Sequence, residues 1–189
     1  MIYDSQEQYQ SMLRAFQDLQ AISDDAGREV QIGDPRPSDA ARTFFLQCYH
    51  LKDWLKKDSR IGDPKAVERW INQCEALSIA ADVCNSLKHA GLSQPPRSGK
   101  ALEMINLAYR LDFPPGAKTD IKFLKQPIDG DTITICRTPL AILKGKPIAT
   151  AEIILTLDGV QRPALIVARQ CIQDWDQFLS DNGISFQKE

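Results

Sequence analysis

The sequence predicts an α+β fold, in which an N-terminal helical hairpin or bundle is followed by a small antiparallel sheet and a C-terminal helix. Two observations support this fold class. Up to about residue 92, apolar residues recur every three or four positions, which is typical of amphipathic helices. From residue 105 they alternate with mostly polar residues, as in strands, until a last helical pattern opens at Pro163.

The chain has 189 residues, which is enough for one well-buried domain. We expect a single domain with a helical part (1–92) and a sheet plus C-terminal helix (101–183). The net charge of -2 gives the whole chain no general attraction for nucleic acid or an anionic membrane. No apolar run approaches the ~20 residues of a membrane span, and the start MIYDSQEQYQ lacks the features of a secretion signal. These features predict a cytoplasmic location and no membrane partner.

The cysteines are odd in number and widely spaced, and the chain contains neither a CxxC nor an HxxxH pattern. Paired ligands at short spacing are what a zinc site requires, so we expect no metal and no cofactor. Small buried side chains in a reducing compartment are the expectation for all five: Cys48, Cys74, Cys84, Cys136 and Cys171.

Three helices are expected in the first half. The first runs from Gln6 to about Ile22, and the second starts at Ser38, a favourable N-cap, and ends after Leu55. Asp63 and Pro64 then form a strong start signal, from which the third helix is expected to continue unbroken to Leu92. A connection this short makes the second and third helices antiparallel neighbours.

In the second half, period-2 patterns predict an antiparallel meander of about four strands, although Ala101–Tyr109 also fits a helix. The strand candidates are Ile105–Phe113, Ile121–Leu124, Thr132–Arg137 and Ile148–Leu157. The final helix opens at Pro163 and ends at Asn182-Gly183. Its wide apolar face must dock against the sheet or against the helical half.

The third helix carries a polar row beside its apolar stripe, formed by Ser78, Asp82, Asn85 and His89. Imidazole titrates near neutrality, so His89 is the candidate acid or base, with Lys88 to hold a phosphate and Asn85 to orient the substrate. A purely structural interpretation stays open. Lys88 and His89 suit the negative end of the helix dipole, and Asn85 and Ser78 are able to bond to neighbouring helices.

A straight antiparallel hairpin fixes which residues face one another. It places His50 opposite Ile71 and therefore ~27 Å from His89, so it excludes a direct pair of the two histidines. The same register makes Asp39 and Arg42 the neighbours of the polar row. It predicts a salt bridge between Arg42 and Asp82.

Two further stretches are candidates for binding. The first is a cluster on the second helix, formed by Tyr49, His50, Lys52, Asp53 and Trp54. Its aromatic side chains lie beside cationic ones, which suggests contact with an extended nucleic acid. The alternative is that the aromatic residues pack in a core or an interface. Arg97–Lys100 resembles a fragment of a phosphate-binding loop, but it lacks the preceding strand and the spaced glycine. We expect a solvated turn there.

A helical hairpin whose late polar row ends in histidine resembles the HEPN family, all-α domains that include RNA-cleaving toxins and antiviral defence proteins and often form their sites across a dimer. His89 matches the motif histidine. The motif arginine is missing, because Val83, Cys84 and Asn85 occupy its positions, and Asn85 corresponds only to the polar companion. The resemblance covers about residues 38–92. The strings CYHLKDWL and ADVCNSLKH are also similar to a bacterial family, and that similarity implies no activity.

Two functions follow. One is a non-catalytic helical interaction module of a bacterial cytosolic protein, which forms a homodimer or docks to a protein partner, with a toxin–antitoxin or phage-defence setting. The alternative is a metal-independent, HEPN-like ribonuclease that uses His89 as acid or base, with Lys88 and Arg42 on the phosphate and Asn85 on the substrate. The missing arginine favours the first function, and RNA remains a candidate ligand of either.

Overall fold

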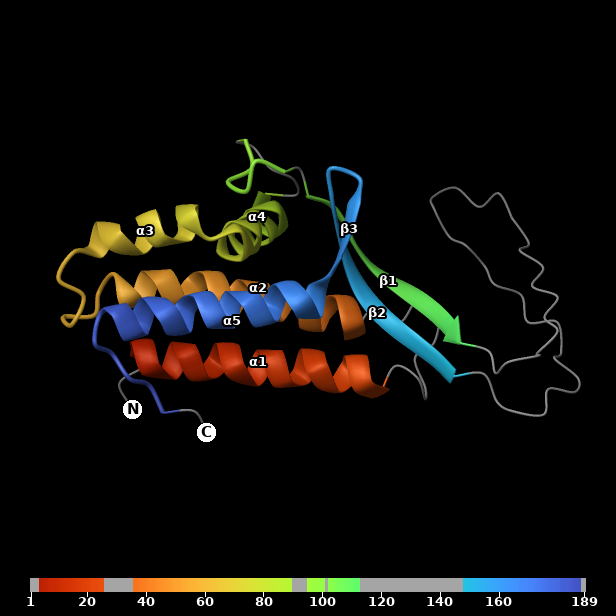
Figure 1. Cartoon of the computed structure of the whole chain (residues 1–189), viewed down its shortest axis with the longest axis horizontal. Coiled ribbons are helices and arrows are strands. Elements are labelled where there is room, and N and C mark those ends of the chain that lie inside the picture. The colour runs from red at the N-terminus through yellow and green to blue at the C-terminus, as the bar shows by residue number, and fades with distance from the viewer. Residues whose placement is uncertain (1–3, 26–35, 90–94, 101, 113–147, 188–189) are drawn as a thin grey trace, which may run out of the picture.

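The computed structural model describes residues 4–25, 36–89, 95–100, 102–112 and 148–187 (Figure 1). These ranges contain the helices α1 (Ser5–Asp25), α2 (Arg36–Leu55), α3 (Pro64–Gln73), α4 (Glu75–His89) and α5 (Ala164–Asp181), and the strands β1 (Leu102–Asp112), β2 (Ile148–Leu157) and β3 (Val160–Pro163). The predicted α+β class is confirmed. No helix within the described ranges is long and apolar enough to cross a membrane.

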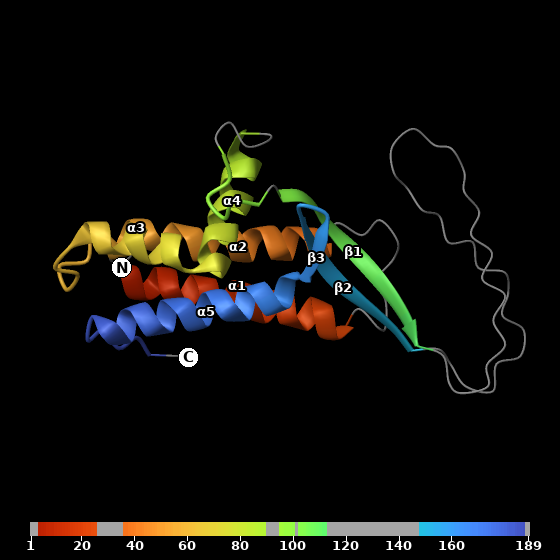
Figure 2. The same ribbon diagram turned by 45° about the horizontal axis from the view of Figure 1, so that its top comes forward.

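The helical part is built on α1, α2 and α5, which lie side by side (Figures 1 and 2). Their apolar stripes bury large side chains completely, including Met12 on α1, Phe44 and Leu51 on α2, and Trp175 on α5. Burying such a side chain contributes roughly 1.5–3 kcal/mol, so this shared core is the main stabilising feature of the bundle. The helix α2 begins two residues before the predicted Ser38, because proline is tolerated in a first helical turn.

The expected unbroken helix from Asp63 to Leu92 is wrong, although its start is right. Asp63 caps α3 by accepting the backbone N–H of Lys65, and Pro64 occupies the first turn. At Cys74 the backbone is extended, with φ -102° and ψ 114°, and α4 begins at the next residue. Figures 1 and 2 together show that α4 then crosses the direction of α3.

Two hydrogen bonds stabilise this break. The hydroxyl of Ser78 donates to the carbonyl of Ile71 at 2.8 Å, which satisfies an acceptor at the end of α3. The carbonyl of Cys74 accepts the N–H of Ser78 at 3.0 Å and so starts α4. No residue near Cys74 predicts this break, because the helical repeat of apolar residues continues through it without glycine or proline.

The sheet has the order β1-β2-β3, with antiparallel neighbours. Leu155 and Leu157 of β2 are buried in the same core as the helices, while the paired β1 and β2 extend beyond the helical part as a ribbon (Figure 1). The stretch from Leu102 is a strand and not a helix. The candidates Ile121–Leu124 and Thr132–Arg137 lie outside the described residues, and β3 was not predicted.

The final helix forms as predicted and docks on both parts of the fold. Ala168 and Trp175 are fully buried in the common core, which also contains residues of α4 and β2. The indole N–H of Trp70 on α3 donates to the carbonyl of Asp174 at 2.9 Å. The helix ends at Asp181, with Asn182 as its C-cap and Gly183 next, where the sequence indicated.

The described cysteines form no disulfide with one another, and they are small core residues as expected: Cys48, Cys84 and Cys171 are buried and Cys74 is half-buried. Cys136 lies outside the described residues. Burial, together with the neighbouring carboxylate of Asp174, raises the pKa of Cys74 to about 11. This thiol is therefore protonated near neutral pH.

Candidate functional site

The first two residues of the polar row on α4, Ser78 and Asp82, are buried. Ser78 is 3% exposed and Asp82 only 1% exposed. The Asp82 carboxylate accepts two backbone N–H groups, that of Arg97 at 2.6 Å and that of Ser98 at 2.8 Å. Both residues are therefore used to hold neighbouring segments, which is the structural interpretation of the row. Asn85, the third position, is half-buried.

The predicted turn Arg97–Lys100 forms, with Arg97 and Gly99 exposed, and these bonds add an anchor that the sequence did not indicate. The turn is anchored to α4 through its own backbone, and the N–H groups that a phosphate loop would offer to a ligand are taken by Asp82. Lys100 adds an ion pair with Glu75, which begins α4 and also contacts Arg162 at 3.2 Å.

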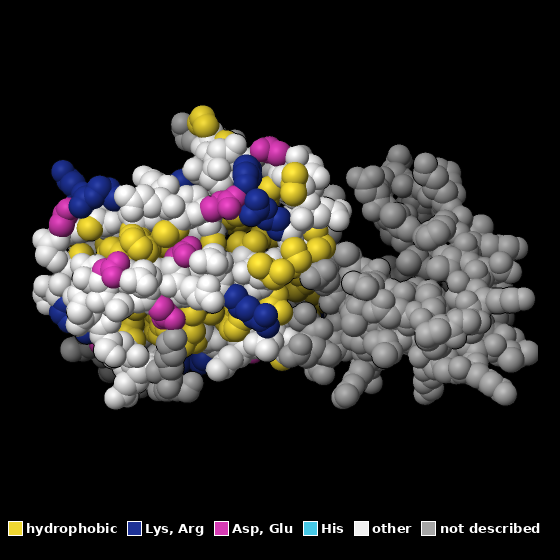
Figure 3. All heavy atoms as spheres, in the orientation of Figure 1, with side chains coloured by type: hydrophobic (Ala, Val, Ile, Leu, Met, Phe, Trp, Pro, Cys, Tyr) yellow, Lys and Arg dark blue, Asp and Glu magenta, His cyan; other side chains and the backbone are white. Residues whose placement is uncertain are grey.

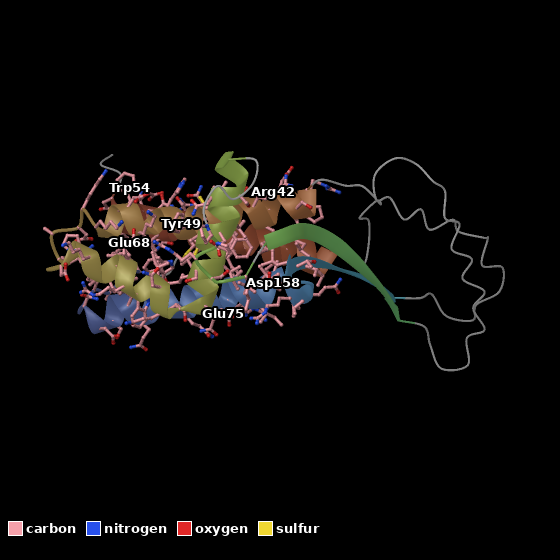
Figure 4. The ribbon with its side chains drawn as sticks, turned by 90° about the horizontal axis from the view of Figure 1, so that it is seen from above. Arg42, Tyr49, Trp54, Glu68, Glu75 and Asp158 are labelled. Carbon is pink, nitrogen blue, oxygen red and sulfur yellow. The ribbon has the colours of Figure 1, made fainter. Side chains whose placement is uncertain are left out.

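The predicted salt bridge between Arg42 and Asp82 is wrong. Arg42 Nη1 lies 3.6 Å from Asp39 Oδ1 on its own helix, and the two side chains are 46% and 63% exposed. Figure 4 shows Arg42 towards the sheet end of α2. Because α4 crosses α2 instead of running beside it, the register of a straight hairpin does not apply to these residues.

The crossing also brings α4 close to His50. The Nε2 atom of His50 lies 4.0 Å from Cys84 Sγ on α4. His89 follows Cys84 by five residues, about 7.5 Å further along a helix axis, so the argument that kept the histidines ~27 Å apart no longer holds. The side chains of Lys88 and His89 lie outside the described residues.

The densest charged group among the described residues is one that the sequence did not reveal. Three cations from two segments meet the carboxylate of Glu68 on α3, and we call these four residues the Glu68 cluster. Lys56 pairs with Oε1, Lys52 lies 3.6 Å from the same oxygen, and Arg97 lies 2.8 Å from Oε2. Figure 4 labels Glu68 on α3 and Tyr49 on α2, whose ring lies 4.5 Å from Lys52 Nζ of the cluster.

Opposing effects set the pKa of Glu68. Burial raises it, but hydrogen bonds from Lys56 and Arg97 and the charges of Arg97 and Lys52 outweigh burial and hold it at about 2. The carboxylate is therefore ionised near neutral pH and binds α3 to α2 and to the turn. A sequence signal did exist, because Glu68, Glu75 and Asp82 are seven residues apart and all three contact the turn Arg97–Lys100.

The aromatic residues of α2 lie against their own cations. Lys52 Nζ is 4.5 Å from the centre of the Tyr49 ring, and Lys57 Nζ is 5.9 Å from that of Trp54. Tyr49 is only 9% exposed, which leaves its ring little surface for stacking on a base. The core alternative therefore suits Tyr49 better than nucleic-acid contact.

The site and the fold together define a small α+β protein whose row of polar groups on α4 mainly links its own segments. Within the described part of the chain, no group of three or more metal-ligating side chains is positioned to hold an ion. Comparison with protein-family models, with curated proteins and with solved structures gives no match.

Proposed function

We propose that this chain is a non-catalytic interaction module of a bacterial cytosolic protein. The observation that carries the proposal is the state of Asp82, which is 1% exposed and accepts two backbone N–H groups. A carboxylate held in this way has no access to a substrate. Asp82 is thus not available to a ligand of the polar row.

The ribbon of β1 and β2 supports an interaction role. Ten pairs of residues join the strands, from Leu102 with Leu157 to Asp112 with Ile148, and within the described residues β1 has a strand neighbour on one side only. An exposed strand edge offers unpaired N–H and C=O groups to another chain. We infer that a second copy of this chain, or another protein, binds along β1.

Apolar side chains at the junction of sheet and helices form a second candidate surface, on the β3 side of the sheet and away from the β1 edge. Val160 is 58% exposed and Ile166 is 62% exposed, and they lie at the starts of β3 and α5. On the face that Figure 3 shows, hydrophobic side chains also appear at the end of the helical part near the sheet. A homodimer or a protein complex in a toxin–antitoxin or phage-defence system is the setting we favour.

The alternative function is metal-independent RNA cleavage with His89, Lys88 and Asn85. One observation favours it: α4 brings His50 against Cys84, on the half of the helix that carries those three residues. Two imidazoles near one phosphate would allow one to act as base and the other as acid. Such a mechanism requires both His50 and His89.

One set of proteins separates the two functions. The wild type, His89→Ala and His50→Ala are induced in a bacterial host, and growth and RNA integrity are followed, with urea unfolding as the control for folding. Equal growth and intact RNA in all three support the module. RNA cleavage by the wild type that both folded variants lose would replace it with the ribonuclease.

The module itself is tested by light scattering after size-exclusion chromatography, over a wide range of concentration. We expect the purified chain to form a dimer that Ile166→Lys weakens, while Arg169→Lys at another exposed site of α5 leaves it unchanged. If the chain remains a monomer throughout and captures no partner through β1, the proposal fails.

A further inference from the structure

The Glu68 cluster holds more positive than negative charge. Lys52, Lys56 and Arg97 approach one carboxylate, and among the described residues the other acid paired with them is Asp53, 3.2 Å from Lys52. Three cations therefore meet two carboxylates, and Asp53 is 54% exposed at the margin. In a chain with a net charge of -2, this is a local excess of positive charge on a partly buried surface.

The geometry of the cluster is that of cations around an anion. Lys52 and Lys56 are one helical turn apart at the end of α2 and both lie near Oε1 of Glu68. Arg97 lies near Oε2 and comes from the turn Arg97–Lys100. Proteins also bind phosphate with lysine and arginine side chains that converge on its oxygens. A phosphate offers more acceptor oxygens and more negative charge than a carboxylate.

The cluster is accessible to a ligand. The side chains of Lys56, Arg97 and Glu68 are each 29% exposed, so the carboxylate is not sealed in the core. The turn that carries Arg97 is held separately by the bonds from its backbone to Asp82. The backbone of Arg97 would thus stay in position if Glu68 moved away.

We propose that Lys52, Lys56 and Arg97 form a phosphate-binding site, in which the carboxylate of Glu68 occupies the place of the anion and competes with it. The phosphate comes either from a free phosphate ion or from the backbone of RNA. This site is distinct from the β1 edge and from His89, so the inference does not rest on the proposed function.

The test uses the full chain in phosphate-free buffer and titrates inorganic phosphate by calorimetry. Lys56→Gln and Lys57→Gln form a matched pair, because they remove the same charge from adjacent residues and only Lys56 pairs with Glu68. Glu68→Gln removes the internal competitor. A second series replaces phosphate with a single-stranded RNA of about 12 nucleotides, within the usual range of site sizes.

We expect Glu68→Gln to bind phosphate about tenfold more tightly than the wild type, Lys56→Gln to bind about tenfold more weakly, and Lys57→Gln to match the wild type. The same order with RNA assigns the site to a nucleic-acid backbone, and a response to phosphate alone assigns it to a small anion. Equal effects of the two lysine variants, or no gain in Glu68→Gln, would overturn the proposal. If Glu68→Gln does not fold, the comparison of Lys56→Gln with Lys57→Gln tests the proposal.

Discussion

Asp82 Oδ1 lies 2.6 Å from the backbone nitrogen of Arg97, and this contact joins α4 to the turn that leads into the sheet. We expect Asp82→Asn to lower the free energy of unfolding by about 1–3 kcal/mol. Both carboxylate oxygens of Asp82 accept a backbone N–H, whereas the asparagine amide has one oxygen and an NH2 group that can only donate. Urea unfolding measures the change. Asp39→Asn is the control, since Asp39 is 63% exposed, and should change stability by less than about 0.5 kcal/mol. Equal effects would show that the Asp82 contacts contribute nothing.

The Glu68 cluster predicts a pH dependence of stability. The pKa of Glu68 falls from 4.5 to about 2 in the folded protein. Its stabilising contribution is therefore complete above pH 4.5 and is lost as the pH falls towards 2. We expect Glu68→Gln to be less stable than the wild type by about 1–2 kcal/mol at neutral pH, given partial exposure to solvent.

The measurement is urea unfolding of both proteins in phosphate-free buffer over this range of pH. The difference in stability should narrow steadily below pH 4.5. A constant difference down to pH 3 would contradict the assignment, because it would mean that the charge of Glu68 plays no part.

Tyr9 predicts the opposite pH dependence of stability, in the alkaline range. Burial, with the hydrogen bond to Asp176 and the charge of that carboxylate, raises the pKa of Tyr9 above its usual 10.0. The neutral phenol thus stabilises the fold fully below pH 10, and this stability is lost as the pH rises further. Tyr9→Phe should cost about 1 kcal/mol near pH 8 and progressively less above pH 10. A cost that grows with pH would show that the phenol is not held neutral.

The backbone conformation at the end of α5 predicts that a side chain at Gly183 lowers stability. Gly183 has a positive φ of 69°, and two hydrogen bonds surround it: Gly183 N–H to the Ser180 carbonyl at 3.0 Å and Ile184 N–H to the Leu179 carbonyl at 2.8 Å. This is the pattern in which glycine closes a helix. Gly183→Ala should destabilise by about 1 kcal/mol. Gly62→Ala is the control, because nothing lies within 4 Å of an added Cβ there and φ is not positive. Thermal unfolding of both variants gives the comparison.

The sequence alone determined the elements whose signals are local. The start of α3 at Asp63 and Pro64 and the end of α5 at Asn182 and Gly183 depend on side chains within a few residues of the boundary, so they were predicted correctly. The apolar repeats of α1, α2 and α5 likewise gave the right helices and the right fold class, because the period of burial follows from the geometry of one helix.

Only the tertiary structure decided how α4 crosses α2, and the candidate site depends on that crossing. The break at Cys74 is held by a bond from Ser78 to Ile71, and the turn at Arg97 is held by Asp82, so both arise from contacts between segments. A residue pattern records which face of a helix is buried, but not the partner against which it is buried. Hence the row from Ser78 to Asp82 was visible in the sequence, whereas its role as an anchor and the cations around Glu68 were not.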